Sequence, residues 1–394
     1  MKVIPYGRQN ITEEDIQAVI ETLNSDYLTQ GPKIAEFESA FASYIGSKYA
    51  IALANGTAAL HLCAMALDVQ PGDKVITTPI TFAASANCIR YCGGEVVFGD
   101  IDPETYLLNI DSVKELLQNS PKGTYKGIIP VDFAGRAIDL EKYRELASEY
   151  DLWIIEDSCH SPGGYFIDSK NNKQNCGNGN FADLAIFSFH PVKHIASGEG
   201  GMITTNDEKL YNKLLKLRTH GITKDESTYS NSIEFAGGID SYPLWYMEMQ
   251  ELGYNYRLTD FQAALGLSQL KRADKGLVRR REIAKIYTDS FSEKSFIIGQ
   301  SGYIEGHAYH LYVIEVENRL GLYNFLRENK IFAQIHYIPC HLMPYYRQLG
   351  WKEGDKPYSE EYYKKCISLP MYPTLTVEEQ QFVINKIISF YENK

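Results

Sequence analysis

This sequence has no excess of basic residues. Its 39 Lys and Arg residues are outnumbered by 50 Asp and Glu residues, and the formal net charge at pH 7 is −11. Nucleic acids and anionic membranes attract proteins through clustered positive charge, so this balance argues against both as the main partner. Long apolar runs are absent too, since no stretch reaches the roughly 18 residues that a membrane-spanning helix needs. We therefore expect no membrane segment.

Paired cysteines and a secretory signal are also missing. The seven cysteines are odd in number, scattered along the chain and without a CxxC pair. Disulfide-rich secreted domains and structural zinc sites space their cysteines more regularly. The first residues, MKVIPYGRQNITEED, lack the apolar region of a signal peptide. Together these features predict a reduced, cytoplasmic protein.

Short apolar runs alternate with helical patterns through the first half of the chain. Strands that are apolar on both faces and alternate with helices predict a largely parallel sheet covered on both sides. The sequence is therefore expected to fold as an α/β protein. The runs expected to be strands are 49–54, 74–79, 95–101, 127–133, 152–158, 184–190 and 201–205.

The second half of the chain has a different texture. A polar and aromatic segment at 220–257 predicts a loop or hairpin, and loops of this length are usually functional. Residues 258–291 predict one long helix with a kink near Gly276, because glycine weakens a helix interior. The remaining residues mix short strands and helices. We predict a large domain over 1–255 and a smaller α+β domain over 256–394.

The stretch IFSFHPVKHIASGEGG, residues 186–201, surrounds one lysine with two histidines and several glycines. His190 and His194 have the spacing of zinc ligands on a helix, but Pro191 lies between them and the glutamate base of a zinc protease is missing. No metal site is expected. The glycines follow Lys193, whereas a nucleotide P-loop places them before its lysine. A reactive amine at Lys193 remains, beside the simpler interpretation that the histidines form hydrogen bonds in a packed loop.

Three other segments favour the reactive amine. An enzyme that uses pyridoxal 5′-phosphate needs a lysine for its aldehyde, a carboxylate at its pyridine nitrogen, a phosphate site and a stacking side chain. Asp157 ends an apolar strand, residues 55–58 lie between a strand and a helix, and Phe82 follows another strand. Each of these could instead have a structural role: Asp157 as a helix cap, residues 55–58 as a capped helix start and Phe82 as a core residue. Their order before Lys193 is that of fold type I enzymes.

At this point the sequence resembles the DegT/DnrJ/EryC1/StrS family of sugar aminotransferases, from about residue 5 to the C-terminus. The resemblance implies a fold of the aspartate aminotransferase type, with a mostly parallel seven-stranded sheet in the large domain. It is carried by LTQGPKIAEFE (28–38), NGTAALHL (55–62), TTPITFAASAN (77–87), EDSCHSPGG (156–164), FSFHPVKHIASGEGGMITT (187–205), LRTHG (217–221) and GYNYRLTDFQAALGLSQL (253–270).

The resemblance also assigns residues to roles. Lys193 would form the Schiff base as the catalytic residue, and Asp157 would pair with the pyridine nitrogen. Asn255 would reach the phosphate from the neighbouring subunit, so that a homodimer would share its active sites. The other expected cofactor contacts are Gly56, Thr57, Ala58, Phe82, His160 and Ser188, and the expected substrate contacts are Tyr6, Arg257, His336 and Tyr337.

Within the family, segments such as VDFAG (131–135) and IFAQIHYIPCH (331–341) resemble the members that act in pseudaminic acid biosynthesis. This implies transfer of an amino group from L-glutamate to C4 of a UDP-linked 4-keto-6-deoxy-N-acetyl-hexosamine by ping-pong chemistry. Family members that act at C3 or C4 of dTDP- or GDP-linked ketosugars share most of these motifs. A sugar dehydratase would carry histidine in place of Lys193, and a non-enzymatic regulator would not need the complete set.

Overall fold

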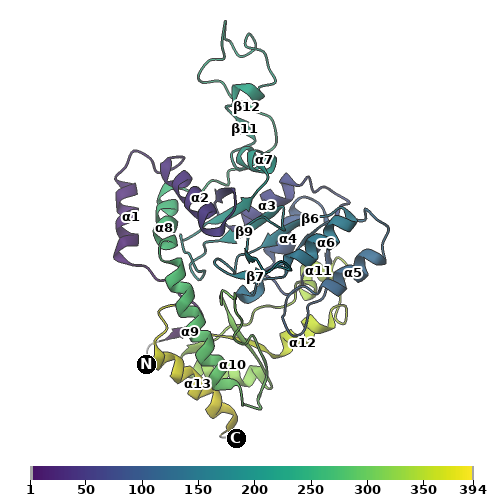
Figure 1. Ribbon diagram of the computed structural model, residues 1–394, viewed down its shortest axis with the longest axis vertical. Helices are drawn as coiled ribbons and strands as arrows, with labels where there is room; N and C mark the ends of the chain where they lie inside the picture. The colour runs from purple at the N-terminus through teal and green to yellow at the C-terminus, as the bar shows by residue number, and fades with distance from the viewer. Residues whose placement is uncertain (1–2, 393–394) are drawn as a thin grey trace.

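The computed structural model describes residues 3–392, and a seven-stranded sheet forms its centre (Figure 1). Every run predicted to be a strand of this sheet forms one. One strand, β10, runs antiparallel to both of its neighbours, and the others are parallel to one another. The predicted mostly parallel α/β sheet is confirmed. In spatial order the strands are β2 (Tyr49–Leu53), β10 (Gly201–Thr205), β9 (Leu184–Ser188), β6 (Trp153–Asp157), β5 (Tyr125–Ile129), β3 (Lys74–Thr77) and β4 (Glu95–Phe98).

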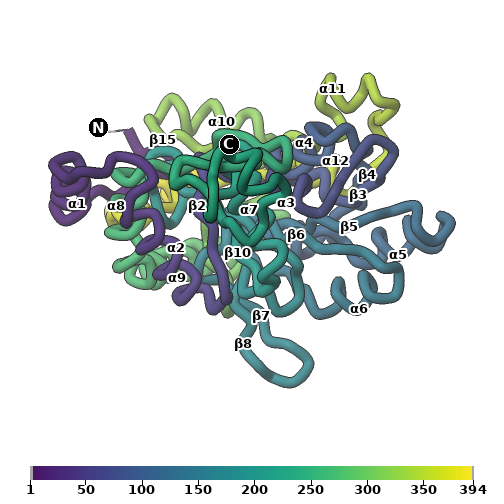
Figure 2. The backbone as a smooth tube through the Cα atoms, turned by 90° about the horizontal axis from the view of Figure 1, so that it is seen from above, coloured from purple at the N-terminus to yellow at the C-terminus, as the bar shows by residue number. Residues whose placement is uncertain are grey.

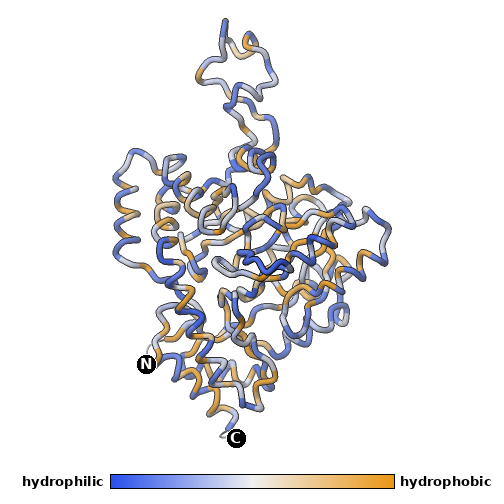
Figure 3. The backbone as a smooth tube through the Cα atoms, in the orientation of Figure 1, coloured by the Kyte–Doolittle hydropathy of each residue, from blue (hydrophilic) through white to orange (hydrophobic). Residues whose placement is uncertain are grey.

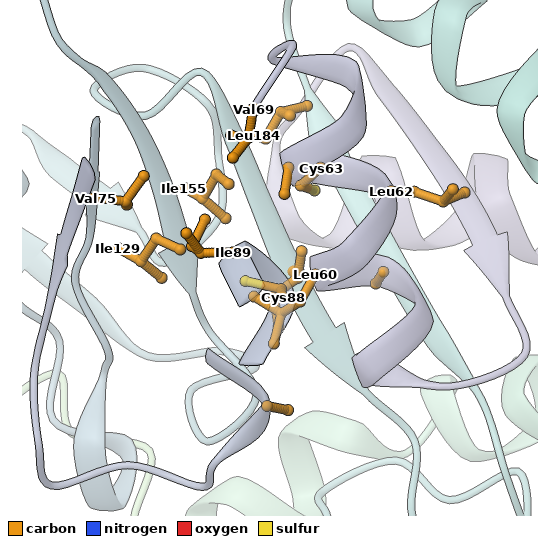
Figure 4. Close-up of a cluster of buried hydrophobic side chains, with 14 of the residues drawn as sticks. Leu60, Leu62, Cys63, Val69, Val75, Cys88, Ile89, Ile129, Ile155 and Leu184 are labelled. Carbon is orange, nitrogen blue, oxygen red and sulfur yellow. The ribbon is translucent and has the colours of Figure 1, made fainter. Parts of the chain in front are cut away.

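Helices cover both faces of this sheet. Successive side chains of a strand point to opposite faces, so Ile129 packs with α3, α4 and α7 while Ile128 packs with α5 and α6. Figure 4 shows Ile129 and Ile155 of the sheet beside Leu60 and Cys63 of α3. On the second face, α2 and α8 cover the β2–β10–β9 side. The bounds are α2 (Pro32–Ile45), α3 (Gly56–Ala66), α4 (Ala84–Tyr91), α5 (Ile110–Gln118), α6 (Leu140–Tyr150), α7 (Glu208–Arg218) and α8 (Asp260–Leu270).

The C-terminal part of the chain builds a separate core. Three antiparallel strands, in the order β13–β14–β16, pack with α9, α10 and α13. The helices α9, α10 and α13 lie at the lower end of the molecule as drawn in Figure 1. Buried residues of these elements form one hydrophobic cluster. The bounds are α9 (Ala273–Phe291), β13 (Ile297–Gln300), β14 (Tyr312–Val316), α10 (Arg319–Glu328), β15 (Ile331–Phe332), α11 (Pro344–Arg347), α12 (Pro357–Lys365), β16 (Cys366–Leu369) and α13 (Val377–Glu392).

Two segments cross the proposed division at residue 255. The first strand, β1 (Ile4–Pro5), pairs in parallel with β15, and Ile4 is buried in the C-terminal cluster. In the other direction, α8 packs between α1 (Glu13–Leu23) and α2. We propose domains over 1–255 and 256–394. The pairing of β1 with β15 and the packing of α8 against α1 and α2 connect them.

The helix predicted over 258–291 is two helices. Its break lies at Lys271 and Arg272, between α8 and α9, whereas Gly276 lies inside α9. The kink predicted near Gly276 is therefore a break four residues earlier, and the glycine itself is helical. Arg272 leaves the helical conformation, and its guanidinium forms an ion pair with the buried Asp15 at 2.5 Å. This anchoring contact with α1 comes from residues 257 positions apart, so local propensity does not reveal it.

The segment predicted as a loop or hairpin projects from the body as a long arm (Figure 1). Its stem is the antiparallel pair β11 (Ile222–Thr223) and β12 (Glu248–Met249). Glu248 is buried and accepts the backbone N–H groups of Ser230 and Asn231 at 2.7 and 2.9 Å, which closes the base of the loop. Hydrophobic residues are concentrated in the body, and the arm carries a few among polar ones (Figure 3).

A second, smaller hairpin extends from the sheet domain in another direction, at the bottom of the view in Figure 2. It consists of β7 (Tyr165–Ile167) and β8 (Lys173–Asn175), and the buried Asp168 accepts hydrogen bonds from the turn between them. Among residues 3–392, no helix is both long enough and apolar enough to cross a membrane.

Candidate active site

Most of the site residues predicted from the sequence line one cavity. Its volume is about 780 Å³, and it lies where the carboxyl ends of β6 and β9 meet the start of α3. Open α/β sheets bind ligands at this edge. Of the predicted residues, only Asn255 and Arg257 are not among its walls. Those that line it are Tyr6, Gly56, Thr57, Ala58, Phe82, Asp157, His160, Ser188, Lys193, His336 and Tyr337.

Asp157 is the last residue of β6, and its carboxylate is held from two sides. Ser85 of α4 donates its hydroxyl to Oδ2 at 2.6 Å, and the backbone N–H of Cys159 donates to Oδ1 at 3.1 Å. Ser85 is itself within 2.7 Å of the Thr81 hydroxyl. Asp157 is only 5% exposed but still lines the cavity. A carboxylate fixed in this way presents one orientation to a ligand.

Lys193 lies in the loop between β9 and β10. The loop is closed by backbone hydrogen bonds from Phe189 to Gly200 and from Lys193 to His190, at 2.8 and 2.9 Å. Burial lowers the pKa of the Lys193 ammonium, and the nearby Arg280 acts in the same direction, while Cys159 and Asp157 oppose the shift. A lowered pKa increases the neutral amine fraction near neutral pH, as a nucleophilic or basic lysine requires.

The start of α3 forms a cradle for an anion. Asn55 caps the helix, its side-chain oxygen accepting the Ala58 N–H at 2.8 Å. The N–H groups at a helix start lack partners within the helix, which leaves those of Gly56 and Thr57 directed at the cavity end. Ser188 lies against this turn, since a Cβ at Gly56 would come within 3.1 Å of the Ser188 Cβ. Glycine is needed there for this close approach.

Histidines form a neutral wall beside Lys193. The Nδ1 atom of His160 accepts the Ala134 N–H at 3.2 Å, so its Nε2 carries the proton and faces the Tyr337 hydroxyl at 3.3 Å. Burial, with Lys193 and neighbouring histidines, holds the pKa of His160 well below its usual range. Burial likewise lowers the pKa of His336 to about 3. These rings therefore contribute hydrogen bonds, not positive charge, at neutral pH.

An aromatic ring stands open to the cavity. Phe82 is 65% exposed although it lines the cavity, and its ring centroid is 6.5 Å from that of Tyr337. Tyr6 comes from the N-terminal segment and lies 5.2 Å from the His336 ring. Tyr6 and the small-domain residues His336 and Tyr337 therefore lie together in the wall of the cavity.

A family model matches residues 9–388, nearly the whole chain, and is described as the DegT/DnrJ/EryC1/StrS aminotransferase family.

The chain belongs to the DegT/DnrJ/EryC1/StrS aminotransferase family.

Curated relatives match this chain over nearly their whole length. The chain is 39% identical to the spore coat polysaccharide biosynthesis protein SpsC of Bacillus subtilis, over 98% of this chain and 96% of that protein. It is 35% identical to the UDP-4-amino-4,6-dideoxy-N-acetyl-beta-L-altrosamine transaminase of Campylobacter jejuni, over 99% and 98% of the two chains. The resemblance found in the sequence is confirmed, and the chain is an aminotransferase.

Solved structures show the same fold. Helicobacter pylori PseC, an aminotransferase involved in pseudaminic acid biosynthesis, superposes with a TM-score of 0.87 at 29% identity, covering 100% of both chains. The PLP form of Spr1654 from Streptococcus pneumoniae, described as a sugar aminotransferase, gives a TM-score of 0.86 at 28% identity, covering 100% and 99%. The predicted fold type I architecture is confirmed.

Two residues that the family resemblance assigned to the site lie outside the cavity of this single aminotransferase chain. Asn255 is exposed at the base of the arm and forms an isolated bridge with Thr219. Arg257 bridges to Leu53, at the end of β2. Tyr256, between them, lines the cavity, and its hydroxyl lies 3.1 Å from His61 Nδ1.

Sequence reasoning missed several wall residues of this aminotransferase. Ser85 lies in TTPITFAASAN (77–87), three positions after Phe82. This spacing, which can place two side chains on the same side of a helix, was the available signal. The His310 ring lies tilted beside that of His160, with ring centroids 4.3 Å apart, but it is 150 residues away in the sequence and no motif marks it. The two histidines beside Lys193 have different surroundings. His190 lines the cavity, whereas the Nε2 atom of His194 lies 2.8 Å from the carbonyl oxygen of Ala308.

Proposed function

We propose that this aminotransferase moves an amino group from L-glutamate to C4 of a UDP-linked 4-keto-6-deoxy-N-acetyl-hexosamine, with pyridoxal 5′-phosphate held at Lys193. The observation that carries the proposal is one cavity that combines Lys193, with its lowered pKa, and the doubly hydrogen-bonded carboxylate of Asp157. The name of the Campylobacter jejuni relative supports the choice of sugar.

The walls of the cavity fit the cofactor part by part. The start of α3, with Gly56 and Thr57, offers N–H donors and a helix dipole to a phosphate, and Ser188 adds a hydroxyl. Asp157 offers a fixed carboxylate to a protonated pyridine nitrogen. The exposed ring of Phe82 offers a stacking surface. The related structure solved in a PLP form supports the same assignment.

The residues of the chain then have separate tasks. When bound, pyridoxal phosphate supplies a reactive aldehyde and an electron-withdrawing ring. Lys193 would hold the aldehyde covalently and, when released, accept or return a proton at its Nζ atom. Asp157 would keep a proton on the pyridine nitrogen through charge-assisted hydrogen bonding. His160, neutral and held by the Ala134 N–H, would position a hydrogen bond without adding positive charge.

Recognition of the nucleotide sugar would use the other walls. Tyr6, His336 and Tyr337 line the cavity from the N-terminal segment and the small domain. We place Asn255 and Arg257 in the site of the neighbouring subunit of a homodimer, because neither lines the cavity of its own chain. The exposed arm that begins beside them would lie at the same interface.

Mixing two inactive variants tests the shared site. Lys193→Ala and Asn255→Ala subunits would each be defective, but a mixed dimer would contain one site with both defects and one with neither. Random exchange of subunits should restore about a quarter of the normal activity. Mixing each variant with itself is the control. If no activity returns although subunits exchange, the two residues act within one chain and the shared site is wrong.

Cofactor spectroscopy tests the substrate. The purified enzyme should absorb as a pyridoxal phosphate protein and lose this band on addition of L-glutamate. A panel of UDP-, dTDP- and GDP-linked 4-keto and 3-keto sugars is then added, and the recovery of the band is followed. Recovery with the UDP-linked 4-keto-6-deoxy-N-acetyl-hexosamine should be fastest. No recovery with any UDP-linked 4-ketosugar, but recovery with a dTDP- or GDP-linked sugar, would establish the sister specificity instead.

A further inference from the structure

The turn that follows β6, at residues 158–161, carries two groups of the proposed cofactor site. His160 lines the cavity, and the backbone N–H of Cys159 donates to the Asp157 carboxylate at 3.1 Å. A turn is held less firmly than a strand by the hydrogen bonds of the sheet, so its direction depends on other contacts. The turn begins and ends with a serine, and both serines are buried. The groups that hold these serines therefore help to orient the wall of the cavity.

One buried carboxylate holds both serines. Asp132 lies three residues after β5, and its Oδ2 accepts the hydroxyls of Ser158 and Ser161 at 3.1 and 2.6 Å. Its Oδ1 accepts the Ile138 N–H at 2.9 Å. The backbone N–H of Asp132 donates to the Asp157 carbonyl at 3.1 Å. This residue therefore connects the end of β6 with both ends of the turn.

The segment that begins with Asp132 also contacts His160 directly. The Ala134 N–H donates to the Nδ1 atom of His160 at 3.2 Å. Gly135 lies against the backbone of the same histidine, because a Cβ at Gly135 would come within 2.7 Å of the His160 carbonyl oxygen. Both contacts require residues 132–135 to keep their place beside the turn. Asp132 thus acts on His160 through the serines and through its own segment of backbone.

A second buried carboxyl group lies beside Asp132. Glu156 of β6 is 2% exposed, and its Oε2 accepts the Gly177 N–H at 2.9 Å. An oxygen of each carboxyl group and the sulfur of Cys176 all lie within 4.8 Å of one another. Within residues 3–392, neither carboxyl group forms an ion pair with Lys, Arg or His. Two buried carboxyl groups this close, without a cation, do not both ionise, so the pair retains one proton.

The proton of this pair belongs to Glu156. Asp132 accepts the hydroxyls of both serines and the Ile138 N–H, and these hydrogen bonds favour a charged carboxylate. Burial raises the pKa of Glu156 well above its usual range, and the charge of Asp132 acts in the same direction. Burial also raises the pKa of Asp132, but the Ser161 hydroxyl and the Ile138 N–H oppose this effect. Glu156 is therefore the neutral partner and donates its proton in a hydrogen bond to Asp132.

We propose that Asp132 and Glu156 are positioning residues of this aminotransferase, and that, sharing one proton, they hold the turn at 158–161 so that His160 and the Cys159 N–H face the cofactor site. A buried carboxylate without a cation is costly, and the hydrogen bond from the neutral Glu156 offsets part of that cost. This inference rests on the proposed function, because it takes pyridoxal 5′-phosphate as the group that the turn faces. It adds how that wall of the cavity is held.

Substitutions at the two carboxyl groups should have different effects. Asp132→Asn leaves one oxygen in place of two, which cannot accept from the serines and from Ile138 together. The apoenzyme should then bind pyridoxal phosphate about 10-fold more weakly, and kcat should fall by about 10- to 100-fold. Glu156→Leu removes the donor to Asp132 and should have a similar effect. Glu156→Gln can still accept the Gly177 N–H and donate to Asp132, so it should recover most of the loss.

Circular dichroism of the bound cofactor gives a readout besides activity. Pyridoxal phosphate is achiral, so its visible signal reports how firmly the walls orient it. Asp132→Asn should lose most of this signal at full occupancy, and Glu156→Gln should keep it. Asp100→Asn is the matched control, because Asp100 is also buried, accepts the Ser359 hydroxyl at 2.5 Å and lies outside the cavity wall. It should lower the thermal stability without changing the cofactor signal or the affinity for the cofactor.

Ser161→Ala provides a second variant that changes no charge. It removes the 2.6 Å hydrogen bond to Asp132 and should weaken the cofactor signal even if Asp132→Asn fails to fold. If Ser161→Ala and any folded Asp132→Asn lower only stability, as Asp100→Asn does, the pair is structural and the inference is wrong. A loss in Glu156→Gln as large as in Glu156→Leu would contradict the shared proton. If the wild type binds the cofactor but aminates no UDP-linked ketosugar, the proposed function fails, while a weakened signal in these variants still supports the inference.

Discussion

The larger cavity described above and a second one, of about 340 Å³, meet at Lys193 and are built in opposite ways. The larger one collects neutral histidines, tyrosines and a fixed carboxylate at the ends of parallel strands. The smaller one collects arginines and lysines where the N-terminal segment crosses the junction of two helices. Strand ends are held in place by the hydrogen bonds of the sheet, so they suit a cofactor that must be held in one orientation. The charges of the smaller cavity come from distant segments, so its shape depends on how these segments pack.

Among residues 3–392, Lys193 is the one residue that lines both cavities. This position explains why its ammonium experiences opposing influences, with Asp157 and Cys159 raising its pKa and Arg280 lowering it. Burial decides the direction, and the pKa is lowered. Removing Lys193 and changing the walls of the larger cavity one at a time therefore separates their contributions to the chemistry.

Removing the shared residue should have the largest effect. Lys193→Ala should lower kcat for transamination by on the order of 10³-fold or more, because both the covalent anchor and the proton carrier are lost. The protein should still fold, because the loop that carries Lys193 is closed by backbone hydrogen bonds that do not involve the lysine side chain. Steady-state kinetics and thermal unfolding measure these outcomes. Lys170→Ala, on the exposed β7–β8 turn, is the control. A variant with undiminished turnover would remove Lys193 from the mechanism.

Changing the larger cavity alone should have the next largest effect. Asp157→Ala should reduce kcat by about 10²- to 10³-fold, because the pyridine nitrogen would lose the carboxylate that keeps it protonated. The absorption band of the bound cofactor should shift as well. Undiminished turnover together with an unshifted cofactor band would remove Asp157 from the cofactor site.

A third change acts on Asp157 through its neighbour. Ser85→Ala removes the donor to Asp157 Oδ2 and should lower kcat by about 10- to 100-fold, since a hydrogen bond to a charged group is lost. Ser85→Thr keeps the hydroxyl and should recover most of the activity. The cofactor band and the pH profile should move in Ser85→Ala but not in Ser85→Thr. A change in stability with no change in either spectrum or pH profile would leave Ser85 a structural role only.

Much of the larger cavity could be predicted because its parts follow from local rules. Asp157 ends an apolar strand, residues 55–58 form a capped helix start, and both strand ends reach the same edge of a parallel sheet. The family resemblance then added roles for residues such as Tyr6 and His336, which local patterns do not single out. The fold class followed from the alternation of strands and helices for the same reason.

The smaller cavity could not be predicted in this way. Arg8, Lys193 and Arg280 come from distant segments, and only the tertiary fold places their charges around one space. The helix break at Arg272 depends on Asp15, which lies far away in the sequence. Isolated arginines on helices are usually solvated, so their spacing carries no signal for such a cavity. Long-range packing decides such features.

The neutral histidine wall gives the smallest and most specific prediction. The pKa of His336 is lowered to about 3 by burial, below its value near 6.5 in an unfolded chain. Its contribution to stability is therefore present above pH 6.5 and is lost as the pH falls toward 3. Between pH 7.5 and pH 5.5 this residue alone should lower the free energy of unfolding by about 1 kcal/mol. Chemical denaturation at the two pH values measures the difference.

His336→Gln isolates this contribution. Glutamine can still bond to Ser368, which His336 Nδ1 contacts at 2.9 Å, but it does not titrate. The variant should therefore lose less stability than the wild type over the same pH interval, and its absolute stability at pH 7.5 is compared separately. Lys170→Ala, on the exposed β7–β8 turn, is again the control and should leave the pH dependence as it is. An identical pH slope in wild type and His336→Gln would mean that His336 is not held neutral, and the electrostatic contrast between the two cavities would be reduced.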